Sequence, residues 1–251
     1  MKSNRPNPGH ANQGSISAQH GVARVISKRG ICSRSQAEAL VRDGQVRVAG
    51  RVIRDPYTPT RSDAEIIIEG AAAAPVQRRY LILNKPRGMV TTASDESGRA
   101  TVYACFEGNS LPWLAPVGRL DKASEGLLLF SNDSEWAARI AAPESHLNKT
   151  YHVQIDRLPD APLMSALQFG IEERGERLAA VSVRELRRGE KNAWLEIVLD
   201  EGRNRQIRRL LSAFDVSVLR LIRVAIGPLA LGDLAKGKWR ELSDDEVTIL
   251  G

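Results

Sequence analysis

The sequence predicts an α+β protein in which a small N-terminal helix-helix-hairpin domain precedes a larger domain built on a mixed, mainly antiparallel sheet with flanking helices. Three observations support this prediction. Two helical apolar faces and a tight hairpin follow one another within residues 21–54. A run of four alanines and a proline then ends at residue 75. After it, strand-like apolar runs mix irregularly with helical segments, which favours α+β over a regular βαβ series.

The first elements follow from local signals. Residues 22–26 place their apolar side chains on one helix face, and Gly30 then offers a left-handed stop. The Ser and Gln at the ends of residues 33–36 have the spacing of a capping box, which predicts a second helix that Gly44 ends. Residues 45–53 alternate apolar and basic side chains around Ala49-Gly50, so we expect a strand, a tight turn and a second strand.

The chain is expected to divide into four segments. Residues 66–68 are three isoleucines, which predict a closing strand of the first domain. The alanine-rich stretch that follows has the composition of a linker. We therefore expect a disordered tail at 1–19, the first domain at 20–70, a linker at 71–78 and a domain of catalytic size at 79–251.

The second domain offers five clear elements. Residues 80–83 and 127–130 are short apolar runs typical of buried strands. Residues 151–155 and 194–199 alternate as strands with one buried face do, and residues 134–142 have helical spacing.

Composition narrows the class of protein. Lys and Arg number 36 against 30 Asp and Glu, a formal charge of +6, and residues 1–70 hold eleven of the basic and six of the acidic residues. Eight of these basic side chains lie between residues 21 and 54, a density that suits phosphate contacts or else a solvated surface. No apolar run approaches the roughly 18 to 20 residues of a membrane span, so we expect no membrane partner.

The N-terminus and the cysteines indicate the compartment. The first twenty residues lack the apolar block of a secretory signal, and two basic residues among them are a weak signal for a transit peptide. Cys32 and Cys105 lie far apart, and no His has metal-ligand spacing, which argues against a metal site or a disulfide framework. We expect a cytoplasmic protein with reduced thiols.

Three polar stretches of the second domain could carry chemistry. The first, V-G-R-L-D-K-A-S-E-G-L-L-L-F at residues 117–130, places Asp121 in a charged loop that runs into an apolar strand. That carboxylate could be a nucleophile, a general base, a metal ligand or the ion-pair partner of Arg119 or Lys122. The second, K-T-Y-H-V-Q-I at residues 149–155, places Tyr151 on one strand face, as a core residue or as a platform for a nucleobase.

The third stretch is E-G-R-N-R-Q-I-R-R-L-L-S-A-F at residues 201–214, whose apolar residues have helical spacing. Four arginines fall in its first turns, where cations oppose the positive end of the helix dipole. They are Arg203, Arg205, Arg208 and Arg209. This placement suggests that phosphates or a carboxylate such as Asp121 lie nearby.

The N-terminal domain resembles a known RNA-binding module. The string S-R-S-Q-A-E-A-L-V-R-D-G-Q-V-R-V-A-G-R-V, residues 33–52, is similar to the S-four domain. The resemblance implies that Arg34, Arg42 and Arg47 face folded RNA. This chain has Ala49 where that family usually has Asn, which bears on the type of turn.

The second domain resembles the RsuA-like branch of the pseudouridine synthases. The resemblance runs through Y-L-I-L-N-K-P-R-G, G-R-L-D-K-A-S-E-G-L-L-L-F-S-N-D, K-T-Y-H-V, E-G-R-N-R-Q-I-R-R-L, L-R-L-I-R-V-A-I-G and L-A-K-G-K-W-R-E-L. It implies that Asp121 is the catalytic aspartate, Tyr151 the active-site tyrosine and Arg208 the basic residue of the third motif. It also brings four further basic residues to the RNA, namely Lys85, Arg119, Arg203 and Arg205.

The implied reaction isomerises uridine to pseudouridine in ribosomal RNA, without a cofactor or metal, by a monomeric enzyme. Its ionised aspartate needs a compensating cation if buried, such as Arg208, although Arg203 and Arg205 lie close in sequence. The string L-R-L-I-R-V-A-I-G-P-L-A-L-G-D-L-A-K-G is more similar to the members that act on the large subunit. The alternatives are a small-subunit target, a non-catalytic ribosome-assembly factor, or a metal-dependent enzyme that uses Asp121 with Asp133 or Glu125.

Overall fold

The computed structural model describes residues 19–69, 71–93, 95 and 97–251. The described chain forms two compact units. The smaller comprises the residues up to 27 together with 32–74, and the larger comprises 28–31 together with 75–251. Apart from Gln19, the tail expected at residues 1–19 lies outside the described residues.

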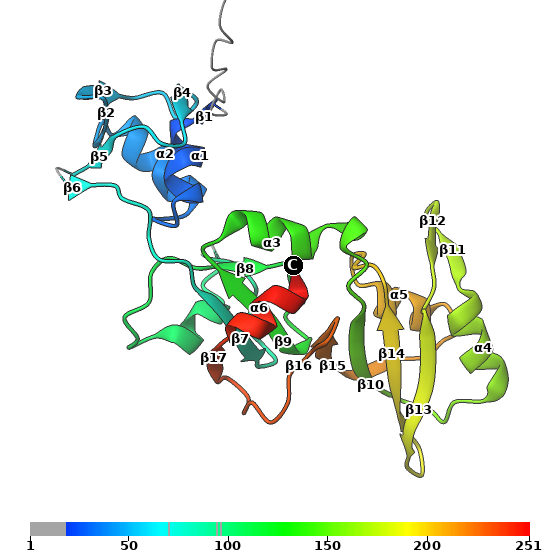
Figure 1. Ribbon diagram of the computed structural model, residues 1–251. Coiled ribbons are helices and arrows are strands. Elements are labelled where there is room, and N and C mark those ends of the chain that lie inside the picture. The colour runs from blue at the N-terminus through cyan, green and yellow to red at the C-terminus, as the bar shows by residue number, and fades with distance from the viewer. Residues whose placement is uncertain (1–18, 70, 94, 96) are drawn as a thin grey trace, which may run out of the picture. The chain divides into compact units, whose positions relative to one another are not determined.

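The smaller unit contains the expected helix-helix-hairpin arrangement (Figure 1). One pair of strands, β1 and β4, lies beside a sheet of order β3-β2-β5-β6. In chain order the elements are β1 (Gln19–Gly21), α1 (Val22–Lys28), α2 (Arg34–Arg42), β2 (Val46–Val48), β3 (Arg51–Ile53), β4 (Pro59–Arg61), β5 (Ile66–Ile68) and β6 (Ala71–Ala72). Strand β6 pairs with β5, so the first two alanines of the stretch expected as a linker belong to the sheet.

Local signals fix these elements as expected. The capping box of α2 is confirmed, because Ser33 Oγ accepts the Gln36 N–H and the Gln36 side chain accepts the Ser33 N–H. The hairpin turn between β2 and β3 places both Ala49 (φ +46°) and Gly50 (φ +78°) in the left-handed region. A two-residue turn of this kind is favoured when both residues tolerate positive φ, and alanine does so at a cost.

The larger unit is built on a nine-stranded mixed sheet. Its main order is β13-β14-β10-β15-β9-β7-β17, with β16 on β15 and β8 on β9. All pairings are antiparallel except that of β15 with β9. These strands are β7 (Tyr80–Lys85), β8 (Ala115–Val117), β9 (Glu125–Ser131), β10 (Lys149–Ile155), β13 (Ser182–Arg188), β14 (Ala193–Leu199), β15 (Val218–Ile226), β16 (Leu229–Ala230) and β17 (Trp239–Glu241). The predicted α+β fold with a mixed, mainly antiparallel sheet is confirmed.

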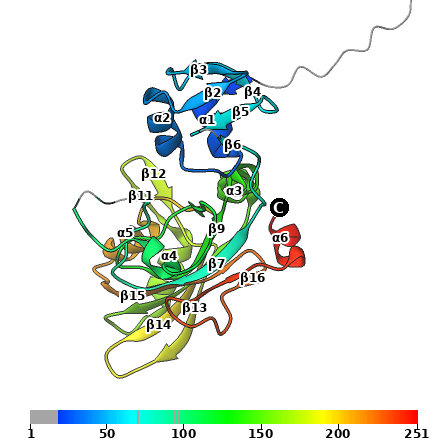
Figure 2. The same ribbon diagram turned by 90° about the vertical axis from the view of Figure 1, so that its left-hand side faces the viewer.

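Helices cover the two faces of this sheet, and a separate hairpin lies beside it. The helices are η1 (Val102–Phe106), α3 (Ser134–Ala141), η2 (Pro143–Ser145), α4 (Ala161–Phe169), α5 (Gln206–Ser212) and α6 (Asp244–Leu250), and the hairpin is β11 (Ile171–Glu173) with β12 (Glu176–Leu178). One apolar core unites the sheet with η1, α4 and α5. A second core, on the opposite face, contains residues of α3 and α6 (Figure 2).

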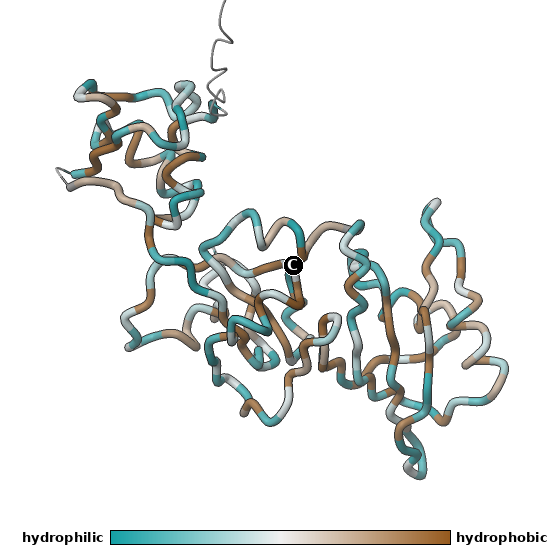
Figure 3. Tube along the Cα trace, viewed as in Figure 1, coloured by the Kyte–Doolittle hydropathy of each residue, from teal (hydrophilic) through white to brown (hydrophobic). Residues whose placement is uncertain are grey.

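Hydropathy follows this layering. In Figure 3 the strands in the middle of the sheet are the most hydrophobic part of the trace, and the tip of the β11–β12 hairpin is hydrophilic. All seven residues of β9 are buried, which explains why its sequence is an apolar run rather than an alternating one. No helix in the described part of the chain is long and apolar enough to cross a membrane.

Candidate active site

Asp121 lies in the loop of residues 118–124, between β8 and β9, which we call the Asp121 loop. Its side chain is 36% exposed, so the carboxylate reaches solvent rather than lying in the core. Arg205 Nη1 lies 3.5 Å from Asp121 Oδ2. The two side chains form an ion pair at the end of the apolar strand β9, which is where the sequence placed the reactive carboxylate.

The backbone of the Asp121 loop is held by the segment that follows β7. The Thr91 hydroxyl donates to the carbonyl of Leu120 at 2.7 Å and accepts from the N–H of the same residue at 3.3 Å. The N–H of Gly88 donates to the carbonyl of Lys122 at 2.7 Å. Because Thr91 is 8% exposed, its contacts with Leu120 replace bonds that water could otherwise make.

Lys85, at the end of β7, lies underneath the loop and is fully buried. Its ammonium donates to the carbonyls of Pro86 at 3.1 Å, Asp121 at 3.2 Å and Ser124 at 2.8 Å. Burial lowers the pKa of Lys85 to about 8, against the opposing influence of Asp121 and Glu125. All three of its hydrogen bonds go to main-chain carbonyls inside the protein, which favours a role for Lys85 under the loop; its contact with RNA stays a prediction.

Arg208 anchors the same loop from the other side. Its Nη2 donates to the carbonyl of Ala123 at 3.2 Å and its Nη1 to that of Val218 at 3.3 Å. Burial lowers its pKa, as does Arg205, while Asp121 nearby raises it. Arg205, not Arg208, makes the ion pair with Asp121. With Arg208 in place, the five successive carbonyls of residues 120–124 each accept a hydrogen bond.

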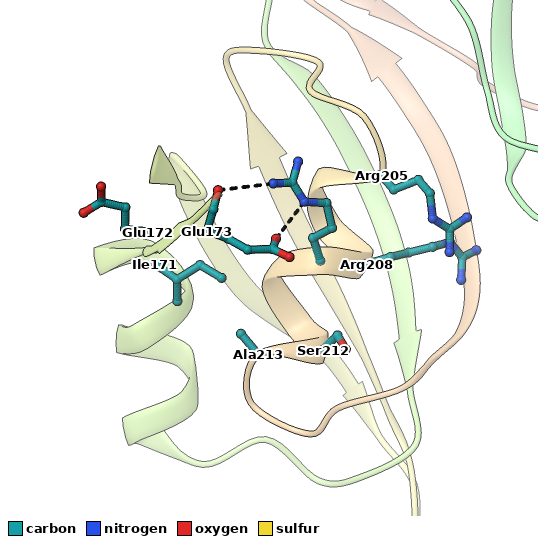
Figure 4. A pocket seen from close by; sticks show the side chains of 8 residues that line it. Ile171, Glu172, Glu173, Arg205, Arg208, Ser212 and Ala213 are labelled. Carbon is teal, nitrogen blue, oxygen red and sulfur yellow. Dashed lines mark hydrogen bonds and ion pairs between the residues drawn. The ribbon is translucent and has the colours of Figure 1, made fainter. Parts of the chain in front are cut away.

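The position of Arg205 depends on how α5 begins. The helix starts at Gln206, so Arg203 and Arg205 precede it instead of lying in its first turns. Arg205 adopts a left-handed conformation (φ +49°) at the N-cap. Figure 4 shows the side chains of Arg205 and Arg208 extending from the same side of α5. Arg203 pairs with Glu201 at 2.7 Å instead of joining them.

Tyr151 lies on the same sheet as the strand that follows the loop. On β10 it is 8% exposed, and the alternation expected for residues 151–155 is confirmed. It pairs with Arg223 of β15, which pairs in turn with Gly126 of β9. A Cβ at Gly126, where φ is +100°, would lie 2.3 Å from the Arg223 carbonyl oxygen. Glycine is therefore required where β9 approaches β15, one strand away from Tyr151.

The carboxylates that a metal-dependent reaction would use beside Asp121 are engaged elsewhere. Glu125 is 2% exposed and bonds to Arg220 at 3.1 Å and to Lys236. Burial alone would raise the pKa of Glu125, but the hydrogen bonds from these two cations lower it. Asp133 caps α3 and accepts a bond from the Tyr80 hydroxyl. Within the described ranges, no three His, Cys, Asp or Glu side chains gather as a metal site would require.

The remaining predicted site residues are distributed over both units. In the smaller unit, Arg34 and Arg42 each pair with Glu38 at 3.2 Å, and Arg47 donates to the carbonyl of Gly50. In the larger unit, Arg119 is exposed.

Thr91 is a functional candidate that the sequence did not reveal. It stands in a short polar stretch with no periodicity, and its role depends on the return of the Asp121 loop from a distant part of the chain.

Comparison with known proteins identifies the family. The family model described as RNA pseudouridylate synthase matches residues 79–213, and the S4 domain model matches residues 22–66. The chain belongs to the RNA pseudouridylate synthase family. It is an RNA-modifying enzyme that isomerises uridine in RNA, with an S4 domain that binds RNA. The resemblance to the RsuA-like branch is confirmed.

Individual relatives cover almost the whole chain. A protein of Aquifex aeolicus named "Uncharacterized RNA pseudouridine synthase" is 37% identical over 232 residues, 91% of this chain and 92% of that protein. "Ribosomal large subunit pseudouridine synthase B" of Bacillus subtilis is 33% identical over 228 residues, 90% of this chain and 93% of its own length. A solved structure titled "Crystal structure of pseudouridylate synthase" matches with a TM-score of 0.65 and 28% identity, covering 92% of this chain and all of that one.

Proposed function

We propose that this enzyme converts one specific uridine of large-subunit ribosomal RNA to pseudouridine, with Asp121 as the catalytic carboxylate acting on a flipped-out base. The single observation that carries the role of Asp121 is its ion pair with Arg205 on a loop whose carbonyls are fixed from residue 120 to residue 124. The fixed carbonyls hold the loop in place, and Arg205 places a cation beside the carboxylate, so the group is preorganised as a nucleophile or general base needs to be. The relative in Bacillus subtilis that is named for the large ribosomal subunit supports the choice of substrate.

The reaction accounts for the residue types. Isomerisation breaks the bond between the base nitrogen and the sugar, turns the base, joins the sugar to a ring carbon and moves the proton of that carbon to the freed nitrogen. No atom is gained or lost overall, and no electrons enter or leave. Asp121 supplies the negative charge for bond breaking, Arg205 balances that charge, and Arg208 and Lys85 fix the loop.

Tyr151 is proposed as the platform for the extruded base. Its ring belongs to the apolar core of the larger unit, and an aromatic face can stack on a uracil removed from its RNA helix. Its hydroxyl is proposed to assist the final proton removal. Six arginines that are partly or fully exposed are proposed to contact the RNA backbone, namely Arg34, Arg42, Arg47, Arg119, Arg203 and Arg205. We expect a monomeric, cytoplasmic enzyme.

Mapping pseudouridine in ribosomal RNA by mass spectrometry tests this proposal. Cells that lack the gene should lose one large-subunit pseudouridine, which the wild-type gene restores and the Asp121→Asn gene does not. Loss of a small-subunit modification would instead assign the enzyme to the other subunit. If every pseudouridine persists without the gene while ribosome assembly is impaired, the protein acts as a non-catalytic assembly factor.

A further inference from the structure

The β11–β12 hairpin is a separate two-stranded element that is not hydrogen-bonded to the nine-stranded sheet. It follows α4 and lies next to α5, beyond the end of the sheet (Figure 1). Its turn consists of Arg174 (φ +53°) and Gly175 (φ +74°), both in the left-handed region. Leu178 of β12 is fully buried in the main core, so apolar packing holds the base of the hairpin, and ion pairs hold its outer part.

Arg209 of α5 makes those contacts to both strands of the hairpin. Its Nε bonds to Glu173 of β11 and its Nη1 to Glu176 of β12, each at 2.7 Å. A third bond joins Nη1 to the carbonyl of Asn204, just before α5. The Arg209 side chain is only 18% exposed, so these charge-assisted bonds are partly shielded from solvent. The carboxylates in turn raise the pKa of Arg209.

The same helix borders the catalytic loop on its other side. Arg205 and Arg208, labelled in Figure 4, bond to residues of the Asp121 loop, whereas Arg209 bonds to Glu173 and Glu176 of the hairpin. A pocket of about 540 Å³ lies between α5 and β11. It is lined by Ile171, Glu172, Glu173, Arg205, Arg208, Arg209, Ser212 and Ala213. This volume falls within the roughly 300 to 1,000 Å³ of pockets that hold small ligands.

The hairpin and the adjoining end of α4 expose groups of the kind that single-stranded RNA binds, beside the exposed carboxylate of Glu172. Arg174 at the tip is 84% exposed. The guanidinium of Arg177 lies 5.8 Å from the centre of the Phe169 ring, and Phe169 is 78% exposed. Exposed aromatic rings and guanidinium groups bind unstacked bases and phosphates. An exposed ring beside a cation suits a partner that offers both bases and negative charge.

We propose that the β11–β12 hairpin guides the RNA segment adjoining the target uridine across α5, and that Arg209 is a positioning residue that latches this guide to the helix. The inference rests on the proposed function, because it takes RNA with a flipped-out uridine at Asp121 as the substrate. Arg209 itself does not contact the RNA in this arrangement, since Glu173 and Glu176 engage its guanidinium. Without the ion pairs of Arg209, the hairpin that forms one wall of the pocket is free to move, and RNA binding weakens.

Two variants break the latch from opposite sides. Arg209→Gln removes a positive charge, whereas the double variant Glu173→Gln/Glu176→Gln removes two negative charges and leaves Arg209 in place. We expect both to raise KM for an unmodified large-subunit ribosomal RNA transcript, and its Kd in filter binding, by at least about fivefold. The rate at saturating RNA should change much less. The matched control is Arg188→Gln, which breaks a similar pair with Glu185 on β13 and should leave KM unchanged.

The double variant distinguishes a latch from direct binding of phosphate by Arg209. If Arg209 bound phosphate directly, the double variant would bind RNA as well as the wild type or more tightly, because it is the more positive protein. That result overturns the latch, as does a lower melting temperature with KM and Kd unchanged. If the wild type binds the transcript but forms no pseudouridine, the proposed function fails, and the Kd values still decide the role of Arg209.

Discussion

Replacing Lys85 with methionine tests whether the Asp121 loop is held from below. Methionine keeps the length and apolar character of the side chain but donates no hydrogen bond. Asp121 O retains the Ser124 N–H at 3.0 Å, while the carbonyls of Pro86 and Ser124 lose the Lys85 ammonium as their donor. Leaving a buried carbonyl unpaired costs about 1 to 3 kcal/mol. The Ser124 carbonyl is buried and that of Pro86 only partly so, which makes about 2 to 6 kcal/mol an upper range for the two.

The loss of the buried charge offsets this cost. Lowering the pKa of Lys85 from its ordinary 10.5 to about 8 corresponds to a cost of about 3 kcal/mol for keeping the buried ammonium charged. Methionine carries no charge to bury, so the net change in the free energy of unfolding should stay within about 3 kcal/mol of zero. Catalysis has no such compensation, since a displacement of about 1 Å in a reacting group can cost about 100-fold in rate.

Thermal unfolding and single-turnover pseudouridine formation measure the two effects separately. We expect the Lys85→Met enzyme to unfold cooperatively near the wild-type temperature and to react about 100-fold more slowly. Lys191→Met, on the exposed turn between β13 and β14, controls for the loss of a lysine charge in the same unit. A Lys85→Met rate within about threefold of wild type would refute the anchoring argument.

Four further predictions follow, three from the contacts of the Asp121 loop and one from the hairpin turn of the smaller unit. Above pH 8 the neutral Lys85 amine has two N–H groups for three carbonyls. The single-turnover rate should therefore fall with an apparent pKa of about 8, and the Lys85→Met enzyme should not show this fall. The free energy of unfolding should instead rise with pH. The cost of burying the Lys85 charge is present below pH 8 and is lost as pH rises toward 10.5, which chemical denaturation across this range measures. Thr91→Val leaves both polar groups of Leu120 unpaired and should cost about 2 kcal/mol in denaturation and lower the rate, with Thr91→Ser restoring both. Ala49→Gly relieves the left-handed backbone and should stabilise the smaller unit by about 0.5 to 1 kcal/mol, whereas an unchanged melting temperature would contradict the strain.

The elements that depend on neighbouring residues were predictable. The capping box at Ser33, the hairpin turn at Ala49-Gly50 and the apolar run of β9 each depend on signals within a few residues. The alanines after β5 were harder to interpret, because their small side chains carry no strand pattern. Ala71 and Ala72 become a strand only through their pairing with Ile67 and Ile68.

The site was predictable in its parts but not in its contacts. Lys85 stands in a Lys-Pro-Arg-Gly string that is typical of an exposed turn, yet its pairing opposite Gly126 buries it under the loop. The arginine that faces Asp121 could not be chosen by helical spacing, because Arg205 precedes α5 in a left-handed conformation. Both outcomes depend on strands and loops that are distant in sequence and meet only in the folded chain.

The role of Asp121 is tested most directly by comparing the purified wild type with Asp121→Asn on one unmodified large-subunit ribosomal RNA transcript. Binding by filter retention and pseudouridine formation by mass spectrometry are measured in the same samples. We predict that Asp121→Asn binds the RNA within a few-fold of wild type and forms no pseudouridine. Pseudouridine formation by Asp121→Asn at the wild-type rate would contradict the assignment of this carboxylate as the catalytic group.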